Sequence, residues 1–368
     1  MNYNSTFIVD TKRIKKNLDK ILNNISDTTQ VIPVLKANAY GHGLIGVAEV
    51  FEDYPQIQYI AIAHPFEAIQ LKQAHISKKI MLVCSITQPQ LEEMVDHKIE
   101  LLLHDYTSIT KIREYLLENN ISNYPVHLKI NTGLNRLGFK PESLLDVIDL
   151  LKDDVFSIQS VYTHFIEGAK VESNISYKQK ERFDQAIEIL DTQNVPYGFK
   201  HMCDSGAYEW FKEAHYDAIR IGRALYMDNP YKEDRFKDAG SWEATLLSKR
   251  KLNEGESIGY GQAFTASKEM DIGIMNVGYG DGMMILDSNI KRYTLIRDKK
   301  APILSIAMDQ TYLDITDIDA EIGDTITIFG STPTHGYLST HDTTKQFDDE
   351  GCTLTTLISN RVKRKFIK

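Results

Sequence analysis

The chain has 368 residues, a net charge of −9 and 42% apolar residues, the composition of a globular protein large enough for two domains. The acidic balance and the lack of a basic patch argue against nucleic acid and membrane surfaces as partners. The N-terminus has no secretory pattern, and no stretch nears the roughly 18 apolar residues of a spanning helix. Three separated cysteines without a CxxC pair indicate reduced thiols in a cytoplasm.

The first part of the chain alternates short apolar runs with amphipathic helices. The runs are nearly continuous in apolar residues, as expected of strands covered on both faces. They are residues 31–35, 59–63, 80–84, 99–103, 126–130, 158–163, 197–202 and 218–221. Eight such strands separated by helices predict a closed parallel (β/α)8 barrel of the TIM type, with an open doubly wound sheet as the alternative.

Three helix starts are marked by residues that favour them. Asp10 or Thr11 can cap the first helix, Asp105 can cap a later one, and Pro141 suits a first helical turn. The apolar side chains expected to face inward after Pro141 are Leu144, Leu145 and Ile148.

The pattern changes after about residue 231. A charged connector, residues 232–240, is followed by short alternating segments with glycine turns, such as 254–258 and 321–328. These segments predict antiparallel strands, whereas the polar stretch 335–351 is predicted to be a loop. We therefore expect an α/β protein with a barrel in residues 1–235 and a β-rich domain in 236–368. Residues 1–10 are a candidate strand of the second domain.

The active site of such a barrel lies at the C-terminal ends of its strands, and the loops after the last two strands commonly bind phosphate. The reactive or small residues expected there are Lys36, Lys129, Arg136, His164, Ser205, Arg220 and Gly222. Lys36 ends the first strand, where burial would favour its neutral amine. A neutral amine can form a Schiff base with an aldehyde. A structural lysine with a solvent-exposed amine is the alternative for this residue taken alone.

The run from Lys36 to Gly43, KANAYGHG, resembles the cofactor-lysine signature of bacterial alanine racemases, which are pyridoxal-phosphate enzymes of fold type III. Further motifs follow in that family's order to the end of the chain. They are KINTG (129–133), RLG (136–138), THF (163–165), DSG (204–206), RIG (220–222), IGYG (258–261), GYGDG (278–282) and MDQ (308–310).

The resemblance implies interconversion of L- and D-alanine by two bases. Lys36 would hold pyridoxal 5′-phosphate and exchange the α-proton on the D face, and Tyr260 of the partner subunit would exchange it on the L face. His164 and Arg220 would form a hydrogen-bonded line behind that tyrosine. Arg220 would also face the cofactor's ring nitrogen, which then stays unprotonated because arginine does not release a proton.

The same resemblance assigns the remaining groups. The residues implied to bind the cofactor phosphate are Tyr40, Ser205, Gly222 and Arg223. Arg136 and the partner subunit's Met308 would bind the substrate carboxylate, and Lys129 would be carbamylated. The protein would be a cytoplasmic homodimer with shared active sites and no metal, making D-alanine for peptidoglycan.

Several positions depart from the family pattern. Asp204 and Asn131 stand where Asn and Asp are usual, and Asn135 is also not the usual residue. Asn360 replaces a tyrosine near the substrate side chain, so we treat it as a specificity residue.

Two other functions compete with the racemase. A fold-related decarboxylase of basic amino acids would need a GGGxG-type loop and a catalytic cysteine in the C-terminal half, and neither is present. A protein that only binds pyridoxal phosphate would be a single barrel without Tyr260.

Overall fold

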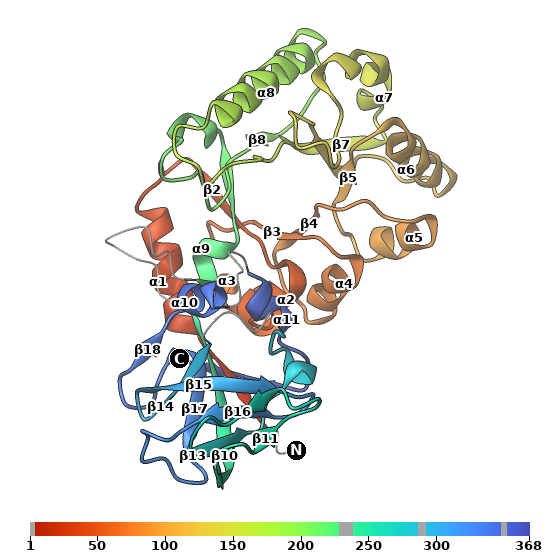
Figure 1. The fold of residues 1–368 in the computed structure, drawn as a ribbon. Helices are drawn as coiled ribbons and strands as arrows, with labels where there is room; N and C mark the ends of the chain where they lie inside the picture. Colours follow the sequence, from red (N-terminus) through yellow and green to blue (C-terminus); the bar gives the residue numbers. More distant parts are fainter. Residues whose placement is uncertain (1–3, 228–237, 286–291, 347–351) are drawn as a thin grey trace. The chain divides into compact units, whose positions relative to one another are not determined.

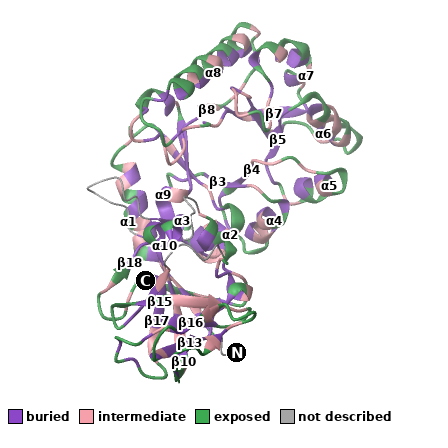
Figure 2. Cartoon of the chain, viewed as in Figure 1, coloured by how far each residue is buried: buried purple, intermediate pink, exposed green. Residues whose placement is uncertain are grey.

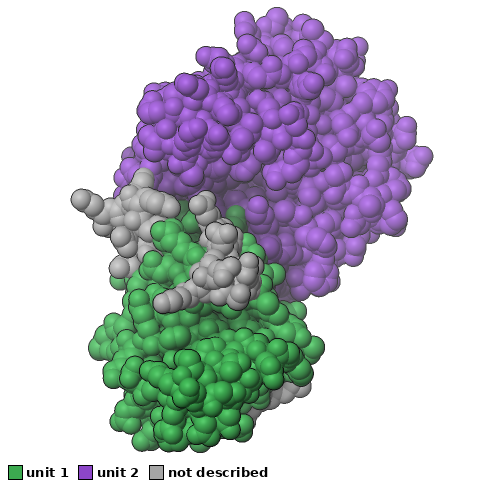
Figure 3. Space-filling view, in the orientation of Figure 1, with its two compact units in different colours: residues 1–17, 40–43, 223–368 green, residues 18–39, 44–222 purple. Residues whose placement is uncertain are grey.

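A computed structural model of the chain describes residues 4–227, 238–285, 292–346 and 352–368. The chain divides into two compact units, coloured separately in Figure 3. One contains residues 18–39 and 44–222, and the other contains 1–17, 40–43 and 223–368. The predicted domain boundary at 235/236 and most of the predicted connector lie outside the described residues.

The first unit is a ring of parallel strands (Figure 1). The strands are β2 (Gln30–Pro33), β3 (Tyr59–Ile62), β4 (Lys79–Leu82), β5 (Leu101–Leu103), β6 (Tyr124–Lys129), β7 (Phe156–Tyr162), β8 (Phe199–His201) and β9 (Ala218–Ile221). Six of them pair in the order β2-β9-β8-β7-β6-β5, and β3 pairs with β4. Parallel bridges Val34–Ala61 and Met81–Glu100 join these two sheets at both edges. The ring is therefore closed, which confirms the barrel and excludes the doubly wound sheet.

Helices surround the ring, and their outward faces are exposed in Figure 2. They are α3 (Leu44–Glu52), α4 (Pro65–Gln73), α5 (Gln88–Asp96), α6 (Tyr106–Glu118), α7 (Ile148–Leu151) and α8 (Asn174–Thr192), with 3₁₀ turns at Pro141–Ser143, Leu145–Val147 and Lys212–Ala214. Asp105 caps α6 as predicted, accepting a hydrogen bond from the Ser108 amide at 2.6 Å. The prediction after Pro141 was wrong in one respect: two 3₁₀ turns replace a regular helix there, and they turn Leu145 outward, where it is 57% exposed.

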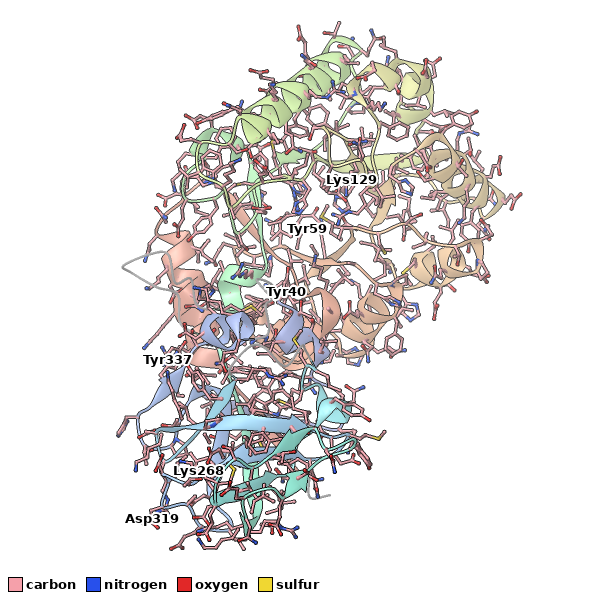
Figure 4. The ribbon with its side chains drawn as sticks, viewed as in Figure 1. Tyr40, Tyr59, Lys129, Lys268, Asp319 and Tyr337 are labelled. Atoms are coloured by element: carbon pink, nitrogen blue, oxygen red, sulfur yellow. The ribbon has the colours of Figure 1, made fainter. Side chains whose placement is uncertain are left out.

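The barrel interior is apolar around most of the ring. Its buried cluster is formed by Ile32, Tyr59, Ala61, Met81, Leu102, Tyr162 and Ala218. Figure 4 shows Tyr59 and Lys129 within the ring of strands. An interior filled by side chains supports the strand ends rigidly, which suits an active site at one mouth of the barrel.

The second unit is antiparallel, as predicted, apart from one parallel pair. Its strands are β1 (Thr6–Asp10), β10 (Gly240–Leu252), β11 (Ser257–Ile258), β12 (Phe264–Thr265), β13 (Met270–Met275), β14 (Tyr293–Ile296), β15 (Lys299–Ile306), β16 (Thr311–Asp314), β17 (Thr325–Ser331), β18 (Tyr337–Leu338) and β19 (Lys363–Ile367). The main sheet closes on itself because β10 pairs with both β13 and β17. The N-terminal strand β1 pairs antiparallel with β10 and parallel with β19.

The short helices of this unit are α9 (Arg223–Tyr226), α10 (Thr340–Lys345) and α11 (Thr353–Leu357), with a 3₁₀ turn at Tyr279–Asp281. Helix α1 (Thr11–Leu22) begins in this unit, and Asp10 accepts a hydrogen bond from the Arg13 amide at its start. The loop prediction for 335–351 missed α10, whose polar residues gave no apolar periodicity. Asp238 holds its first residue by accepting hydrogen bonds from the backbone amide and hydroxyl of Thr340. Within the described residues, no helix combines the length and apolar character needed to cross a membrane.

Candidate active site

Lys36 directly precedes a backbone turn of unusual hand. The segment α2 (Lys36–Tyr40) is left-handed, with φ between 53° and 56° at Ala37, Asn38, Ala39 and Tyr40. Non-glycine residues pay about 1–2 kcal/mol each for this conformation, so the turn needs external support. Strain of this kind is commonly found at functional sites.

Glu67 in the first turn of α4 supplies much of that support. Its two carboxylate oxygens accept hydrogen bonds from the amides of Ala37 at 3.3 Å and Asn38 at 2.6 Å. The Asn38 side chain in turn accepts from the Leu44 amide at 2.7 Å, which ties the middle of the segment to the start of α3. Hydrogen bonds to a charged acceptor are among the stronger ones in proteins, and they offset the strain of the turn.

The predicted burial of Lys36 was wrong for the single chain, because its side chain is exposed. The buried strand β2 ends at Pro33, and Lys36 lies beyond it at the barrel mouth, where solvent reaches the amine. Its position after the first barrel strand is as expected.

Four cations gather around His164 at this mouth. Lys129 is 4% exposed at the end of β6, and its amine lies 5.4 Å from the centre of the Tyr162 ring. Burial, together with the positive charges of Arg136, Arg220 and Lys36, lowers the pKa of Lys129 to about 8. So much positive charge in one place is costly unless an anion is bound there.

His164 is held neutral by the same surroundings. Desolvation lowers its pKa well below the usual value, and the charges of Arg220 and Lys129 act in the same direction. The side chain is 35% exposed, and the neighbouring cations disfavour its protonated form in addition to burial. Arg220 Nη2 lies 3.2 Å from His164 Nδ1, so the predicted pairing of these two residues is present.

Arg220 is buried near the end of β9, and its guanidinium donates hydrogen bonds to ring nitrogens and carbonyl oxygens. Nη1 donates to His201 Nδ1 at 2.5 Å, and Nη2 donates to the carbonyls of Thr163 at 2.6 Å and Met202 at 3.2 Å. The guanidinium also lies 5.1 Å from the centre of the Tyr162 ring. These contacts fix its orientation before any ligand binds.

The loops after the last two barrel strands bring two predicted phosphate ligands together. The Gly222 amide donates to the Ser205 hydroxyl at 3.0 Å. Asp204 shapes the turn that carries Ser205, because its Oδ1 accepts from the amides of Gly206 and Ala207. Burial raises the pKa of Asp204, and its Oδ2 lies 3.9 Å from His164 Nδ1.

The loop after β6 carries Arg136 and is organised by the two unusual asparagines. Asn131 Oδ1 accepts from the amides of Gly133 and Asn135, and its amide group donates to the Asn135 side chain at 3.1 Å. Both departures from the family pattern therefore have a local structural role. Arg136 itself is exposed to solvent.

The other predicted site residues belong to the second unit. Tyr40 packs against Tyr226 with 5.3 Å between ring centres, and Arg223 begins α9. Tyr260 is 92% exposed on the turn between β11 and β12, where Gly259 and Gly261 take positive φ. Met308, 53% exposed, lies in the loop between β15 and β16.

Asn360 is exposed in a loop that charged side chains hold in shape. Arg364 donates to the carbonyls of Ile358 and Ser359, and Arg361 pairs with Asp309 at 2.6 Å. Neighbouring residues thus fix the backbone around Asn360.

The sequence analysis did not identify Glu67. It also did not identify the polar residues inside the barrel, among them His127 and His201, that lead to Arg220. One signal could have found the latter: His127 and His201 interrupt runs that are otherwise typical of buried strands. No comparable local signal marks Glu67.

Comparison with known proteins agrees with this geometry. Residues 9–230 match the family model for the alanine racemase N-terminal domain, and residues 239–366 match that for the alanine racemase C-terminal domain. The chain belongs to the alanine racemase family. It is an isomerase of the amino-acid racemase type, and its curated relatives include an alanine racemase of Methanococcus maripaludis, 28% identical over 98% of this chain and 97% of the relative.

Solved structures of alanine racemases have the same fold. The enzyme of Clostridium difficile 630 superposes with a TM-score of 0.91 at 26% identity, covering 100% of this chain and 96% of that one. An alanine racemase from Bartonella henselae, solved with covalently bound pyridoxal phosphate, gives a TM-score of 0.88 at 23% identity, with 100% of both chains covered.

Proposed function

We propose that this alanine racemase family member interconverts L- and D-alanine with pyridoxal 5′-phosphate bound through Lys36. One observation carries the proposal: Lys36, Lys129, Arg136 and Arg220 gather around His164 at the mouth of a closed barrel. Such a cluster suits an anionic cofactor and an amino-acid carboxylate, and Lys36 supplies the amine that an aldehyde cofactor requires.

The residues present fit this cofactor. The phosphate suits the Ser205 hydroxyl and Gly222 amide, which already meet at 3.0 Å in the loops after β8 and β9. The family resemblance names Tyr40 and the Arg223 amide as further phosphate ligands. When bound, pyridoxal phosphate draws electrons from the substrate α-carbon and makes its proton more acidic.

Two bases on opposite faces of the substrate perform the exchange in this proposal. Lys36 removes or returns the proton on the D face, and Tyr260 of the partner subunit does so on the L face. The near-complete exposure of Tyr260 in one chain supports a role at an interface, because an aromatic side chain gains stability when a partner covers it. The protein is then a homodimer with shared sites, and the partner subunit's Met308 amide binds the substrate carboxylate.

Arg220 and His164 control the proton balance of the site. Arg220 keeps its proton, so a ring nitrogen facing it stays unprotonated and electron withdrawal is limited. His164 is neutral and bonded to Arg220, so it can hold the hydroxyl of the partner subunit's Tyr260 by a hydrogen bond.

Lys129 is the proposed carbamylation site. A pKa of about 8 leaves part of its amine unprotonated near neutral pH, and that form adds to CO2. The nitrogen forms a bond to carbon and loses a proton, which gives a carbamate anion. The anion then orients Arg136 for the substrate carboxylate.

The proposed setting is the cytoplasm, where the enzyme makes D-alanine for peptidoglycan. The test is to incubate the purified protein with L-alanine and pyridoxal phosphate and to separate the enantiomers by chiral chromatography. We expect D-alanine to form and the protein to show the visible absorbance of lysine-bound cofactor. Lys36→Ala should abolish both, and retention of either would contradict the role of Lys36.

The shared site has a separate test. Lys36→Ala and Tyr260→Phe subunits, each inactive alone, should regain activity when mixed, because each hybrid dimer has one site with both native groups. Absence of recovery despite demonstrated subunit exchange would contradict the shared site.

A further inference from the structure

A chain of polar side chains crosses the otherwise apolar barrel interior, and the mechanism above uses only its last member. It begins at Glu100, directly before β5, and continues through His127 on β6, Ser160 on β7 and His201 on β8 to Arg220 on β9. Each residue comes from the next strand around the barrel. We call these five residues the interior chain.

Successive members lie within contact distance. His127 Nε2 is 3.0 Å from Glu100 Oε2, and its Nδ1 is 2.7 Å from the Ser160 hydroxyl. That hydroxyl is 2.9 Å from His201 Nε2, and His201 Nδ1 is 2.5 Å from Arg220 Nη1. Each histidine uses both ring nitrogens within the interior chain.

Arg220 and Glu100, at the two ends of the interior chain, favour the same direction of hydrogen bonding. Arg220 can only donate, so His201 Nδ1 must accept and its proton must be on Nε2. That N–H donates to Ser160. The Ser160 hydroxyl keeps one proton to donate, and His127 Nδ1 is the acceptor within reach at 2.7 Å. His127 therefore has its proton on Nε2, directed toward Glu100. A carboxylate accepts only, so a donor-only group at one end is matched by an acceptor-only group at the other.

The interior chain is shielded from solvent. His127, Ser160 and His201 have no solvent exposure, and Glu100 is 5% exposed. Within the described residues, Glu100 Oε2 and His127 Nε2 have no hydrogen-bond partner, and they lie 3.0 Å from each other. The ring N–H is off the line to the oxygen, so this contact is the weakest of the four, but it is the one that can satisfy both atoms.

A reversed interior chain would disturb Arg220. If His127 placed its proton on Nδ1, Ser160 would either keep a buried hydroxyl proton without an acceptor or donate it to His201, whose Nδ1–H would then face the Arg220 N–H. Two buried donors in contact are costly. The rings cannot turn away easily, because the His201 ring lies parallel to that of Tyr162, with 4.9 Å between their centres, and Arg220 lies over the same ring.

We propose that Glu100 is a positioning residue for Arg220, acting through the protonation pattern of His127, Ser160 and His201. Its carboxylate selects the Nε2–H form of both histidines and so keeps an acceptor in front of the arginine. The effect of Glu100 on catalysis rests on the proposed function, in which Arg220 faces the cofactor ring.

Matched variants separate the acceptor from the charge. Glu100→Gln retains an oxygen that can accept from His127, whereas Glu100→Met has similar size and no acceptor. We expect Glu100→Gln to keep kcat for L-alanine within about threefold of the native value. Glu100→Met should lower kcat about tenfold with little change in KM, as loss of a buried supporting partner does at other sites. Ser160→Ala interrupts the interior chain with little risk to folding and should lower kcat similarly.

Tyr124→Phe is the control for stability alone. Its hydroxyl donates to the Ile99 carbonyl at 2.7 Å, beside Glu100, but takes no part in the interior chain. It should lower the melting temperature and leave kcat unchanged. The double variant Glu100→Met with Ser160→Ala should be no slower than the slower single variant, because both break one chain.

A readout independent of turnover is the ¹⁵N NMR spectrum of histidine-labelled protein. The signals of His201 are those that disappear in the His201→Asn variant. Native protein and Glu100→Gln should show His201 protonated on Nε2, and Glu100→Met should shift it toward Nδ1–H. The proposal is overturned if Glu100→Met behaves like Tyr124→Phe in kcat and leaves the His201 spectrum native. It also fails if Glu100→Gln is as slow as Glu100→Met, since charge would then matter and not the acceptor.

The NMR measurement keeps this proposal distinct from the proposed function. If the native protein failed to racemise alanine, the proposed function would fall while the His201 spectra would still decide the protonation pattern.

Discussion

The barrel and the β-rich unit prepare their predicted catalytic groups in opposite ways. In the barrel, Arg220 and Lys129 are buried, and the turn after Lys36 is held by hydrogen bonds from within the same unit. In the β-rich unit, Tyr260 is on an exposed turn with 92% of its surface accessible. The barrel groups are therefore oriented by the chain's own packing, whereas Tyr260 depends on whatever covers it.

Substitution of Tyr260 gives the largest predicted effect and tests the role of the exposed group in the β-rich unit. Tyr260→Ala should reduce α-proton exchange from L-alanine by about 10²–10⁴-fold, the usual loss when a general base is removed. Exchange from D-alanine should be largely spared, because Lys36 serves that face. Isotope exchange from each enantiomer measures this, and equal losses would contradict the division between two bases.

Substitution of Lys129 tests the buried groups of the barrel, because the lowered pKa of its amine changes how the free energy of unfolding depends on pH. Its pKa in the folded protein is about 8 and ordinarily 10.5, so the unfolded chain binds more protons between these values. The free energy of unfolding should therefore rise with pH across this window. In CO2-free buffer the native protein should gain up to about 3 kcal/mol there relative to Lys129→Met. Denaturant titrations at pH 8 and 10 measure the difference, and parallel pH profiles would show that the amine is not perturbed.

Glu67 tests whether the left-handed turn is prepared in advance. Glu67→Ala removes two hydrogen bonds to backbone amides, worth about 1.5–3 kcal/mol each when the acceptor is charged. The turn should then leave its left-handed form part of the time, and kcat should fall by roughly tenfold. Glu67→Gln retains one acceptor oxygen and should be intermediate. A native kcat in Glu67→Ala would mean that the turn holds its form without the carboxylate.

Asn360 gives the smallest expected effect and concerns the choice of substrate. Its amide can both donate to and accept from a hydroxyl group, which favours serine as an additional substrate. A net hydrogen bond of about 0.5–1.5 kcal/mol corresponds to roughly threefold to tenfold in specificity. Asn360→Tyr should lower the ratio of kcat/KM for L-serine to that for L-alanine by this factor. An unchanged ratio would remove Asn360 from the specificity-determining residues.

The two regions also differ in how well their sequences predicted their structure. The barrel strands were found from runs such as 126–130 and 218–221, because a strand buried on both faces leaves a continuous apolar signal. Asp105 was recognised as a helix cap because capping depends on residues three apart. Helix α10 was missed, since its first residue, Thr340, is held by Asp238, about a hundred residues earlier in the chain.

The sequence alone determined the barrel, the antiparallel second unit and the position of Lys36 after the first barrel strand, because apolar periodicity and motif order are local properties of a chain. The tertiary structure alone decided that Glu67 supports the Lys36 turn and that Glu100, His127, Ser160 and His201 lead to Arg220. These contacts depend on barrel closure and on the register between neighbouring strands. Residues far apart in sequence acquire a common direction of hydrogen bonding only when that register brings their side chains into the same dry interior.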